Sequence, residues 1–230
     1  MASAVGVTVV AAEGAPRVEP LVAELGREVL DGQVASLDAL LATTDSARTV
    51  VLLCIPARVD AGLLDRVVTW ADARRPRPGL IGWANQGSHV DSEAALAAGF
   101  DDFVVGARSP RELAARVRAV HRRVHWNGLR RPGRLRHGGL MLDTDGHELW
   151  VDGRTISLTS TELAVVRALM RARGRTMSRS ELLDHAWGSA NFDISERAVD
   201  NVVLRLRRKL GRADLIRTVR GVGFRLATDE

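Results

Sequence analysis

Cysteine and lysine are nearly absent from this 230-residue sequence, in which Cys54 and Lys209 are the single residues of their kinds. A lone cysteine excludes a disulfide within the chain and is compatible with a reducing compartment. A single lysine excludes lysine-based catalysis from almost every position. No apolar run is long enough to span a membrane, and residues 1–10 read as a buried strand and not as a secretory signal. We therefore expect a cytoplasmic protein that does not enter a membrane.

Arginine supplies almost all of the positive charge, and the formal net charge is +5. A positive excess favours an acidic partner such as nucleic acid. Hydrophobic residues make up 46% of the chain, which is enough for buried cores, and the length suggests two ordinary domains. Composition therefore favours a two-domain protein with a polyanionic partner.

The first half of the chain, residues 1–124, alternates short apolar runs with helical patterns. The predicted strands are 5–10, the neighbours of Val34, 49–55, 80–84 and 103–105, and the predicted helices are 18–30, 37–41, 61–73, 92–98 and 110–124. This alternation predicts an α/β fold, a doubly wound five-stranded parallel sheet with helices on both faces. Ligands of such sheets bind at the carboxyl ends of the strands, so any chemistry is expected there.

The order and spacing of these elements, with the segment D-D-F-V-V-G-A-R-S-P-R-E-L-A-A-R-V-R-A-V, resemble the receiver domain of bacterial response regulators. In that family, two acidic residues after the first strand hold Mg²⁺ and an aspartate ending the third strand accepts phosphate. A Ser or Thr and a Lys follow the fourth and fifth strands. The corresponding positions here are Ala11 and Ala12, Cys54, Trp83 and Gly106. These residues offer neither a hard oxygen ligand nor a carboxylate nucleophile, so the resemblance implies a degenerate phosphorylation site without metal or other cofactor.

Cys54 and Trp83 leave a second interpretation open, in which the emptied pocket binds a metabolite or Cys54 acts as a redox switch. A cysteine that ends an apolar strand is more often a buried small hydrophobe, and no adjacent cation in the sequence indicates an activated thiol. The strand ends also carry no paired acid and base, so we predict no catalytic residues and no enzyme.

Receiver domains of this type commonly dimerise through their fourth helix, fifth strand and fifth helix. By this resemblance, Asp101 and Asp102 pair with Arg116 and Arg123 across the face between two protomers. The alternative is that these four side chains are solvated charges, because exposed ion pairs contribute little. The resemblance thus predicts a homodimer.

Residues 125–134 separate the two halves and contain glycine, proline and clustered arginine without apolar periodicity. Such a segment reads as a basic linker. No acidic residue occurs from Arg116 to His137, so the linker is either a tether attracted to phosphate groups or a solvated hinge.

The second half, residues 135–230, begins with short strands predicted at 140–142, 148–151 and 156–158. The sequences T-S-T-E at 159–162 and S-R-S-E at 178–181 are capping boxes that open two helices, to about residues 173 and 187. A third helix covers 195–210, and I-R-T-V-R-G-V-G-F-R-L closes the chain as a β-hairpin. Three helices followed by a hairpin predict an α+β winged helix-turn-helix domain, whose last helix enters the major groove of DNA.

The third helix has two different faces. At about 100° per residue, Val199, Val203, Leu206 and Leu210 fall on one side, and Arg197, Asn201, Arg205 and Arg208 fall on the other. Ser195 offers a cap at its start and Gly211 a stop at its end. Arginine and asparagine can read guanine and adenine in the major groove, whereas the alternative is a solvated basic face.

The motifs T-S-T-E-L, E-L-L-D-H-A-W-G, R-A-V-D-N-V-V-L-R-L-R-R-K-L-G and I-R-T-V-R-G-V-G-F-R-L resemble the effector domain of the OmpR/PhoB family over most of residues 135–227. The resemblance implies binding to specific sequences of double-stranded DNA. The implied DNA-binding residues are Arg197, Asn201, Leu204, Arg205, Arg207, Thr218 and Arg220. A general architectural protein, to which random DNA would bind equally well, is the alternative that charge alone allows.

The resemblance also implies a role for each of these residues. In the helix, Arg205 contacts a base, Arg197 and Arg207 contact the DNA backbone, and Leu204 meets a thymine methyl group or a sugar. In the hairpin, Thr218 bonds a phosphate and Arg220 reaches the minor groove. The loop at 189–194 resembles the segment through which this family contacts RNA polymerase.

Overall fold

In a computed structural model the chain divides into two compact units, Met1–Trp126 and Asn127–Glu230, which are described separately below. The structure describes residues 5–15, 17–28, 30–43, 50–56, 60–74, 77–86, 89–106, 109–124, 134–144, 148–188 and 194–227. All of the predicted linker except its last residue lies outside these ranges, as does most of the predicted polymerase-contacting loop. The linker and the domain limits drawn around it remain predictions. None of the described helices is long and apolar enough to cross a lipid bilayer.

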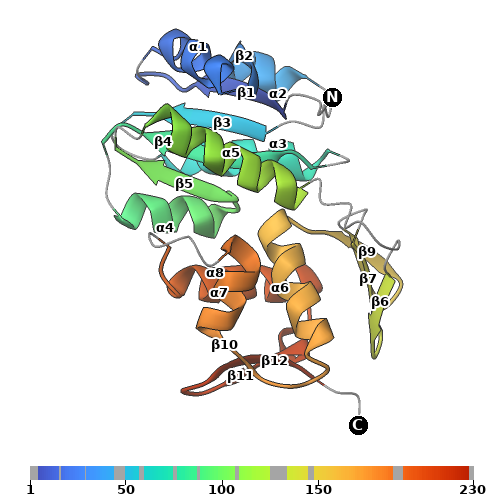
Figure 1. Cartoon of the computed structure of the whole chain (residues 1–230). Helices are drawn as coiled ribbons and strands as arrows, with labels where there is room; N and C mark the ends of the chain where they lie inside the picture. The colour runs from blue at the N-terminus through green and yellow to red at the C-terminus, as the bar shows by residue number, and fades with distance from the viewer. Residues whose placement is uncertain are drawn as a thin grey trace. The chain divides into compact units, whose positions relative to one another are not determined.

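The first unit is a five-stranded parallel sheet with the strand order β2-β1-β3-β4-β5 (Figure 1). Its strands are β1 (Val5–Ala11), β2 (Leu30–Ser36), β3 (Val50–Ile55), β4 (Gly79–Ala84) and β5 (Asp102–Val105). Its helices are α1 (Glu19–Arg27), α2 (Leu37–Ala42), α3 (Ala61–Asp72), α4 (His89–Ala98) and α5 (Pro110–Val124). The predicted doubly wound fold is confirmed.

Two hydrophobic cores cover the two faces of this sheet. One core packs α1 and α5 against β1 and β3, and the other packs α2, α3 and α4 against the opposite face (Figure 1). Strand β3, V-V-L-L-C-I, is buried at every residue because it lies in the centre of the sheet and both of its faces are covered. Its continuous apolar run is what identified it in the sequence.

Helix boundaries agree with the prediction where a cap defines them. The Oγ of Ser109 accepts a hydrogen bond from the amide of Glu112 at 3.3 Å, and α5 starts at Pro110 as predicted. Helix α1 is shorter than predicted and ends at Arg27, because Leu30 already pairs with Val5 as the first residue of β2. No sequence signal marked that early end.

The second unit contains a four-stranded antiparallel sheet, three helices and a three-stranded sheet. The four-stranded sheet comprises β6 (Arg134–His137), β7 (Leu140–Asp143), β8 (Glu148–Val151) and β9 (Arg154–Ser157). The helices are α6 (Ser160–Arg171), α7 (Arg179–Trp187) and α8 (Arg197–Leu210), followed by the short 3₁₀ helix η1 (Ala213–Leu215). The three-stranded sheet comprises β10 (Met177–Ser178), β11 (Ile216–Val219) and β12 (Gly223–Leu226). The predicted winged-helix domain is confirmed.

The sequence interpretation missed two strands of this unit. Strand β6, R-L-R-H, shows no run of apolar residues, and only its first residue, Arg134, belongs to the predicted linker. Strand β10 has two residues and exists only through its pairing with β12. Helix α8 also begins at Arg197, two residues later than predicted, and its N-cap Glu196 makes no side-chain cap bond. The N-cap position is thus one residue later than the predicted Ser195, whereas Gly211 ends the helix in the left-handed conformation, as predicted.

Both predicted capping boxes are present. In α6, the Thr159 side chain accepts from the backbone of Glu162, and the Glu162 side chain accepts from the backbone of Thr159. Ser178 and Glu181 make the same reciprocal pair at the start of α7. These caps satisfy amides that have no partner within a helix and fix where each helix begins.

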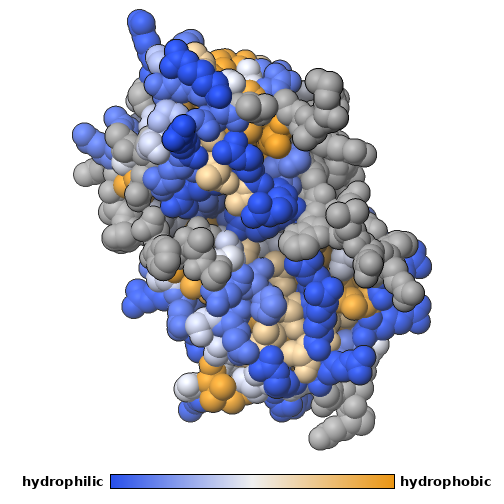
Figure 2. Space-filling view, viewed as in Figure 1, coloured by the Kyte–Doolittle hydropathy of each residue, from blue (hydrophilic) through white to orange (hydrophobic). Residues whose placement is uncertain are grey.

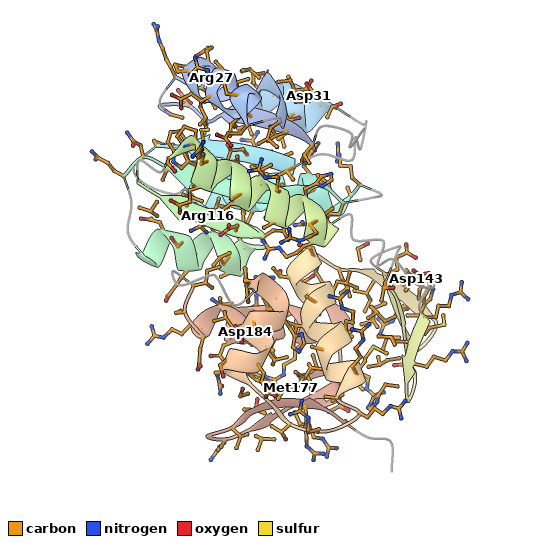
Figure 3. The ribbon with its side chains drawn as sticks, viewed as in Figure 1. Arg27, Asp31, Arg116, Asp143, Met177 and Asp184 are labelled. Carbon is orange, nitrogen blue, oxygen red and sulfur yellow. The ribbon has the colours of Figure 1, made fainter. Side chains whose placement is uncertain are left out.

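Gly223 brings the hairpin, called the wing below, against the start of α7. It pairs with Ser178 across β12 and β10, and a Cβ atom at this position would lie 1.9 Å from the carbonyl oxygen of Met177. Met177 lies beside the hairpin strands (Figure 3). Only glycine permits this approach of two backbones.

We predict that Gly223→Ala destabilises the second unit by about 1–3 kcal/mol, since the added methyl forces the two backbones apart. Urea denaturation followed by circular dichroism measures the change. Gly139→Ala is the matched control, because its nearest neighbour would be a carboxylate oxygen of Asp152 at an ordinary 3.9 Å. Equal midpoints for the two variants would contradict the assignment.

Candidate nucleic-acid interface

Helix α8 buries one face and exposes the other. The four predicted core residues Val199, Val203, Leu206 and Leu210 are all buried, as are Ala198 and Val202. The buried side is therefore wider than predicted, and only a narrow strip of the helix remains outside.

That strip consists of Arg197, Asn201, Leu204 and Arg208, called the outer stripe below. The four residues fall within about 60° of one another around the helix axis. Arg197 and Arg208 are exposed, Leu204 is 46% exposed and Asn201 is half-buried. Among the described residues the exposed large hydrophobics are Leu204, Val222 and Val34, and the face of the molecule visible in Figure 2 is mostly hydrophilic. Exposed large apolar side chains are therefore few among the described residues, and Leu204 is one of them.

Arg205 is not part of this stripe, and its prediction as an exposed base-contacting residue needs correction. Its side chain is 12% exposed, and its Nε donates to Oε1 of Glu162 at 3.2 Å. Helical counting placed Arg205 about 80° from Arg197, at the border of the polar face. A buried carboxylate on α6 draws it inward, and that partner cannot be found from the α8 sequence alone.

Glu162 holds two cations. The Nζ of Lys209 lies 2.8 Å from its Oε2, and its carboxylate also caps α6 through the backbone amide of Thr159. Burial by itself raises the pKa of Glu162. The nearby charges of Lys209 and Arg205 and the hydrogen bonds lower the pKa by more than burial raises it, so the pKa lies below its usual value. Glu162 therefore joins α6 to α8 as an ionised group.

Arg207 also differs from its prediction as a contact to the DNA backbone. Its Nη2 donates to the carbonyl oxygen of Ile216 at 2.6 Å and to the hydroxyl of Thr218 at 2.8 Å. The guanidinium thus connects α8 to β11 within the protein. Thr218 remains exposed, so its hydroxyl proton is available to an outside acceptor.

The tip of the wing carries Arg220 and Val222, both exposed, with Val222 at 52%. Arg220 lies where the sequence predicted it. Val222 and Arg208 are exposed residues that the predicted site left out. Helical counting places Arg208 on the same face as Arg197, so the sequence did carry a signal for it. Val222 gave no signal in the sequence beyond its place in the predicted turn.

The five residues of the degenerate phosphorylation site come together at one edge of the sheet. Ala11 pairs with Cys54 and Cys54 pairs with Trp83 across β1, β3 and β4. The amide of Ala12 donates to the Cys54 carbonyl at 2.9 Å, and the Trp83 indole Nε1 donates to the Gly106 carbonyl at 3.1 Å. Trp83 and Ala11 pack against the buried core. The site is thus closed by apolar contacts and by one hydrogen bond to Gly106.

Cys54 is fully buried, and burial raises the pKa of its thiol to about 12. A thiol of this kind is not ionised at neutral pH, and the thiolate is the reactive form. In the part of the chain that the structure describes, no three His, Cys, Asp or Glu side chains are grouped so that they could hold a metal ion. The geometry therefore agrees with a structural Cys54.

The four residues of the predicted dimer face use their charges within one protomer. Asp101 is fully buried and accepts from Arg77 Nη1 at 3.1 Å and from the Leu80 amide at 2.8 Å. Asp102 is 2% exposed and lies 3.2 Å from Arg116, which projects from α5 (Figure 3).

Arg123 is half-buried, and burial lowers the pKa of its guanidinium. The predicted pairing of Asp101 and Asp102 across two protomers therefore needs correction, because both carboxylates already have arginine partners in their own chain. Neither carboxylate is left exposed for a second protomer.

Comparisons with known proteins agree with the fold of the second unit. A family model described as "Transcriptional regulatory protein, C terminal" matches residues 153–226. The transcriptional regulatory protein TrcR of Mycobacterium tuberculosis is 40% identical over 149 residues, which cover 62% of this chain and 56% of TrcR. The phosphate regulon transcriptional regulatory protein PhoB of Pseudomonas aeruginosa is 38% identical over 135 residues, which cover 58% of each protein. The matches span less than two thirds of the length of these relatives.

Among solved structures, that of a RitR mutant is similar to this chain with a TM-score of 0.66 and 19% sequence identity. The similarity covers 98% of this chain and 100% of that one. At this identity the likeness concerns the fold alone.

The pKa of Glu162 predicts how the second unit responds to acid. A carboxyl whose pKa is lower in the folded state stabilises the fold above its unfolded pKa of about 4.3, and this stability is lost as the pH falls through the folded pKa. Glu162→Gln should therefore reduce stability at pH 7 and weaken the loss of stability below about pH 4.3. Urea denaturation between pH 3 and pH 7 measures both effects.

Glu181→Gln is the matched control, since Glu181 occupies the same capping position in α7 with 44% of its side chain exposed. This variant should lose less stability at pH 7. An acid response of Glu162→Gln identical to that of the unaltered protein would show that Glu162 is not the group responsible.

Proposed function

We infer that this chain, an OmpR/PhoB-type response regulator with a DNA-binding domain, binds specific sequences of double-stranded DNA and regulates transcription in the cytoplasm. The observation that carries the proposal is the outer stripe, which presents two guanidiniums, a carboxamide and one apolar side chain on a helix anchored by its opposite face. An α-helix of this kind fits the major groove. Its relatives are transcriptional regulators and not enzymes, and no catalytic residue is proposed.

Arg208 and Arg197 are the proposed arginine contacts of α8, with Arg208 as the base-reading residue in place of Arg205. Both are exposed, whereas Arg205 is held by Glu162. Arg197 is in the first turn of the helix, where a phosphate contact would fix its position on the duplex. Asn201 lies between them and offers a bidentate partner for adenine.

Leu204 is the proposed apolar reader of the stripe. Hydrogen bonds cannot distinguish thymine by its C5-methyl group, but contact with an apolar side chain can. Leu204 is 46% exposed on this face, so its side chain is accessible to a ligand. We propose that the preferred site contains a thymine opposite Leu204.

The wing is proposed to reach the adjacent minor groove through Arg220, with Thr218 donating to a phosphate. Both side chains are exposed on one hairpin. Arginine is attracted to narrow A·T-rich minor grooves, where the negative potential is enhanced. Contacts in two grooves together would raise the affinity above that of either alone.

Regulation is proposed to be independent of aspartyl phosphorylation. The support is the set of residues at the strand ends, in which Ala11, Ala12 and Cys54 offer no nucleophilic carboxylate and Trp83 bonds to Gly106. A redox-sensing alternative through Cys54 is not favoured, because the thiol is buried and its pKa is raised to about 12. Binding as a homodimer and contact with RNA polymerase remain part of the proposal as expectations from the family resemblance.

Selection of bound duplexes from a random pool by the purified unmodified protein tests the function directly. Arg208→Ala should then cost about 1–3 kcal/mol on the selected duplex and less on a scrambled one, because a base contact is lost. Addition of acetyl phosphate should leave the dissociation constant unchanged. Arg111→Ala is the control for net charge, since Arg111 is 88% exposed in the first unit.

Two results would contradict this proposal. Equal loss of affinity on selected and scrambled duplexes would remove Arg208 as a base contact. Tighter binding after treatment with acetyl phosphate would remove phosphorylation independence.

Replacement of thymine by uracil tests Leu204 without altering the protein. Uracil lacks only the methyl group, whose burial is worth about 0.8 kcal/mol, so one position of the selected site should lose about fourfold in affinity. The Leu204→Ala protein should show no loss at that position. A loss of the same size with Leu204→Ala would show that another side chain meets the methyl group.

A further inference from the structure

Two arginines connect the wing to the helices of the second unit. Arg207 comes from the last turns of α8, and Arg179 is the first residue of α7. Both guanidinium carbons lie near the ring of Phe224 on β12, at 4.9 Å for Arg179 and 5.9 Å for Arg207. These distances are within the range of favourable cation–π contact.

On the α8 side, Arg207 is bonded to the backbone of the wing. Its Nε and Nη2 donate to the Ile216 carbonyl at 3.1 and 2.6 Å, and its Nη2 donates to the Thr218 hydroxyl at 2.8 Å. Ile216 and Thr218 lie on β11, the strand that leads to the tip of the hairpin. Arg207 thus fixes this strand to the helix that carries the outer stripe.

On the α7 side, Arg179 is bonded to α8. Its Nε lies 3.0 Å from Oδ1 and 3.3 Å from Oδ2 of Asp200, and its Nη2 lies 2.9 Å from Oδ1. Asp200 is in the first turn of α8, one residue before Asn201 of the outer stripe. Arg179 therefore joins the starts of two helices to the wing.

Phe224 is the shared partner. It is 2% exposed and pairs with Met177 of β10 on one side and with Thr218 of β11 on the other. A phenyl ring can bind these guanidiniums only through its π system, since it has no hydrogen-bonding group. It lies in the middle strand, in the second residue pair from the turn, so both arginines contact the hairpin close to its tip.

We propose that Arg179, Asp200, Arg207 and Phe224, together called the clamp, set the position of the wing relative to the outer stripe. The clamp residues are positioning residues, and the proposal rests on the proposed function. A two-stranded hairpin has little stability of its own, and among the described residues the strand pairing of the wing extends to two further residues, Met177 and Ser178. Without the clamp, the wing would have to be ordered each time both grooves are engaged, which lowers affinity.

The partial exposure of the ion pair separates this role from a purely stabilising one. Arg179 is 27% exposed and Asp200 is 43% exposed, so their pair contributes little to folding stability. Its effect should instead appear in binding, where the orientation of Arg220 relative to α8 matters. Asp200 also makes a sharp test possible, because it is an anion beside a surface proposed to bind DNA.

Asp200→Asn in the full-length chain provides the primary experiment. The change preserves size and removes a negative charge, so electrostatics alone predicts tighter binding to any duplex. The clamp predicts the reverse, a three- to tenfold weaker affinity for the duplex selected by the unaltered protein. Urea denaturation should give a midpoint close to that of the unaltered protein.

A double-mutant cycle with Arg220→Ala locates the effect in the wing. We expect Arg220→Ala to weaken binding about tenfold in the unaltered protein and less than twofold in the Asp200→Asn or Arg207→Ala proteins. Phe224→Leu, which keeps a buried apolar side chain without a π face, should behave like Arg207→Ala. An unchanged effect of Arg220→Ala in these backgrounds, or tighter binding by Asp200→Asn, would overturn the clamp.

These outcomes differ from failure of the proposed function itself. If the unaltered protein selects no duplex, DNA recognition is wrong and the clamp fails with it. If the unaltered protein selects a site and Arg208→Ala weakens it, the cycle with Arg220 decides on the clamp alone.

Discussion

The ion cluster around Glu162 is the interaction on which the second unit depends. This carboxylate is fully buried, caps α6 through Thr159 and holds Arg205 and Lys209 of α8. A buried charge is tolerated only with close partners, and the removal of one partner leaves the others uncompensated. The cluster keeps Arg205 on the inner side of α8, next to its buried apolar face, and so out of the outer stripe. The DNA specificity proposed for the protein thus depends in part on a buried ion cluster inside the second unit.

In the first unit, apolar residues occupy the strand ends at which receiver domains carry charged and polar side chains. Ala11, Cys54 and Trp83 lie side by side across three strands, and the Trp83 indole satisfies the Gly106 carbonyl. Replacing clustered charges by apolar side chains and one hydrogen bond removes the repulsion that adjacent carboxylates create. The edge of the sheet is therefore filled by packed apolar side chains.

Structural features that depend on neighbouring residues could be predicted from the sequence. The apolar run of β3, the caps of α5, α6 and α7 and the buried face of α8 all follow from spacing and composition. Contacts between distant segments could not be predicted in this way. The sequence predicts Arg205 and Asp101 as surface residues because their partners are distant in the chain. Glu162 is 43 positions from Arg205, and Arg77 is 24 positions from Asp101. Strand β10 has only two residues, and they form a strand because they pair with β12.

The single lysine of the chain has a chemical consequence beyond its ion pair. Enzymatic acylation neutralises lysine ammonium groups and leaves guanidinium charges unchanged. Here the only ε-amine belongs to Lys209, which is 25% exposed and holds a buried carboxylate at 2.8 Å. The arginines of the outer stripe and of the wing tip keep their charge under acetylating conditions. The positive surface of this protein is therefore insensitive to a modification that changes the charge of lysine-rich DNA-binding proteins.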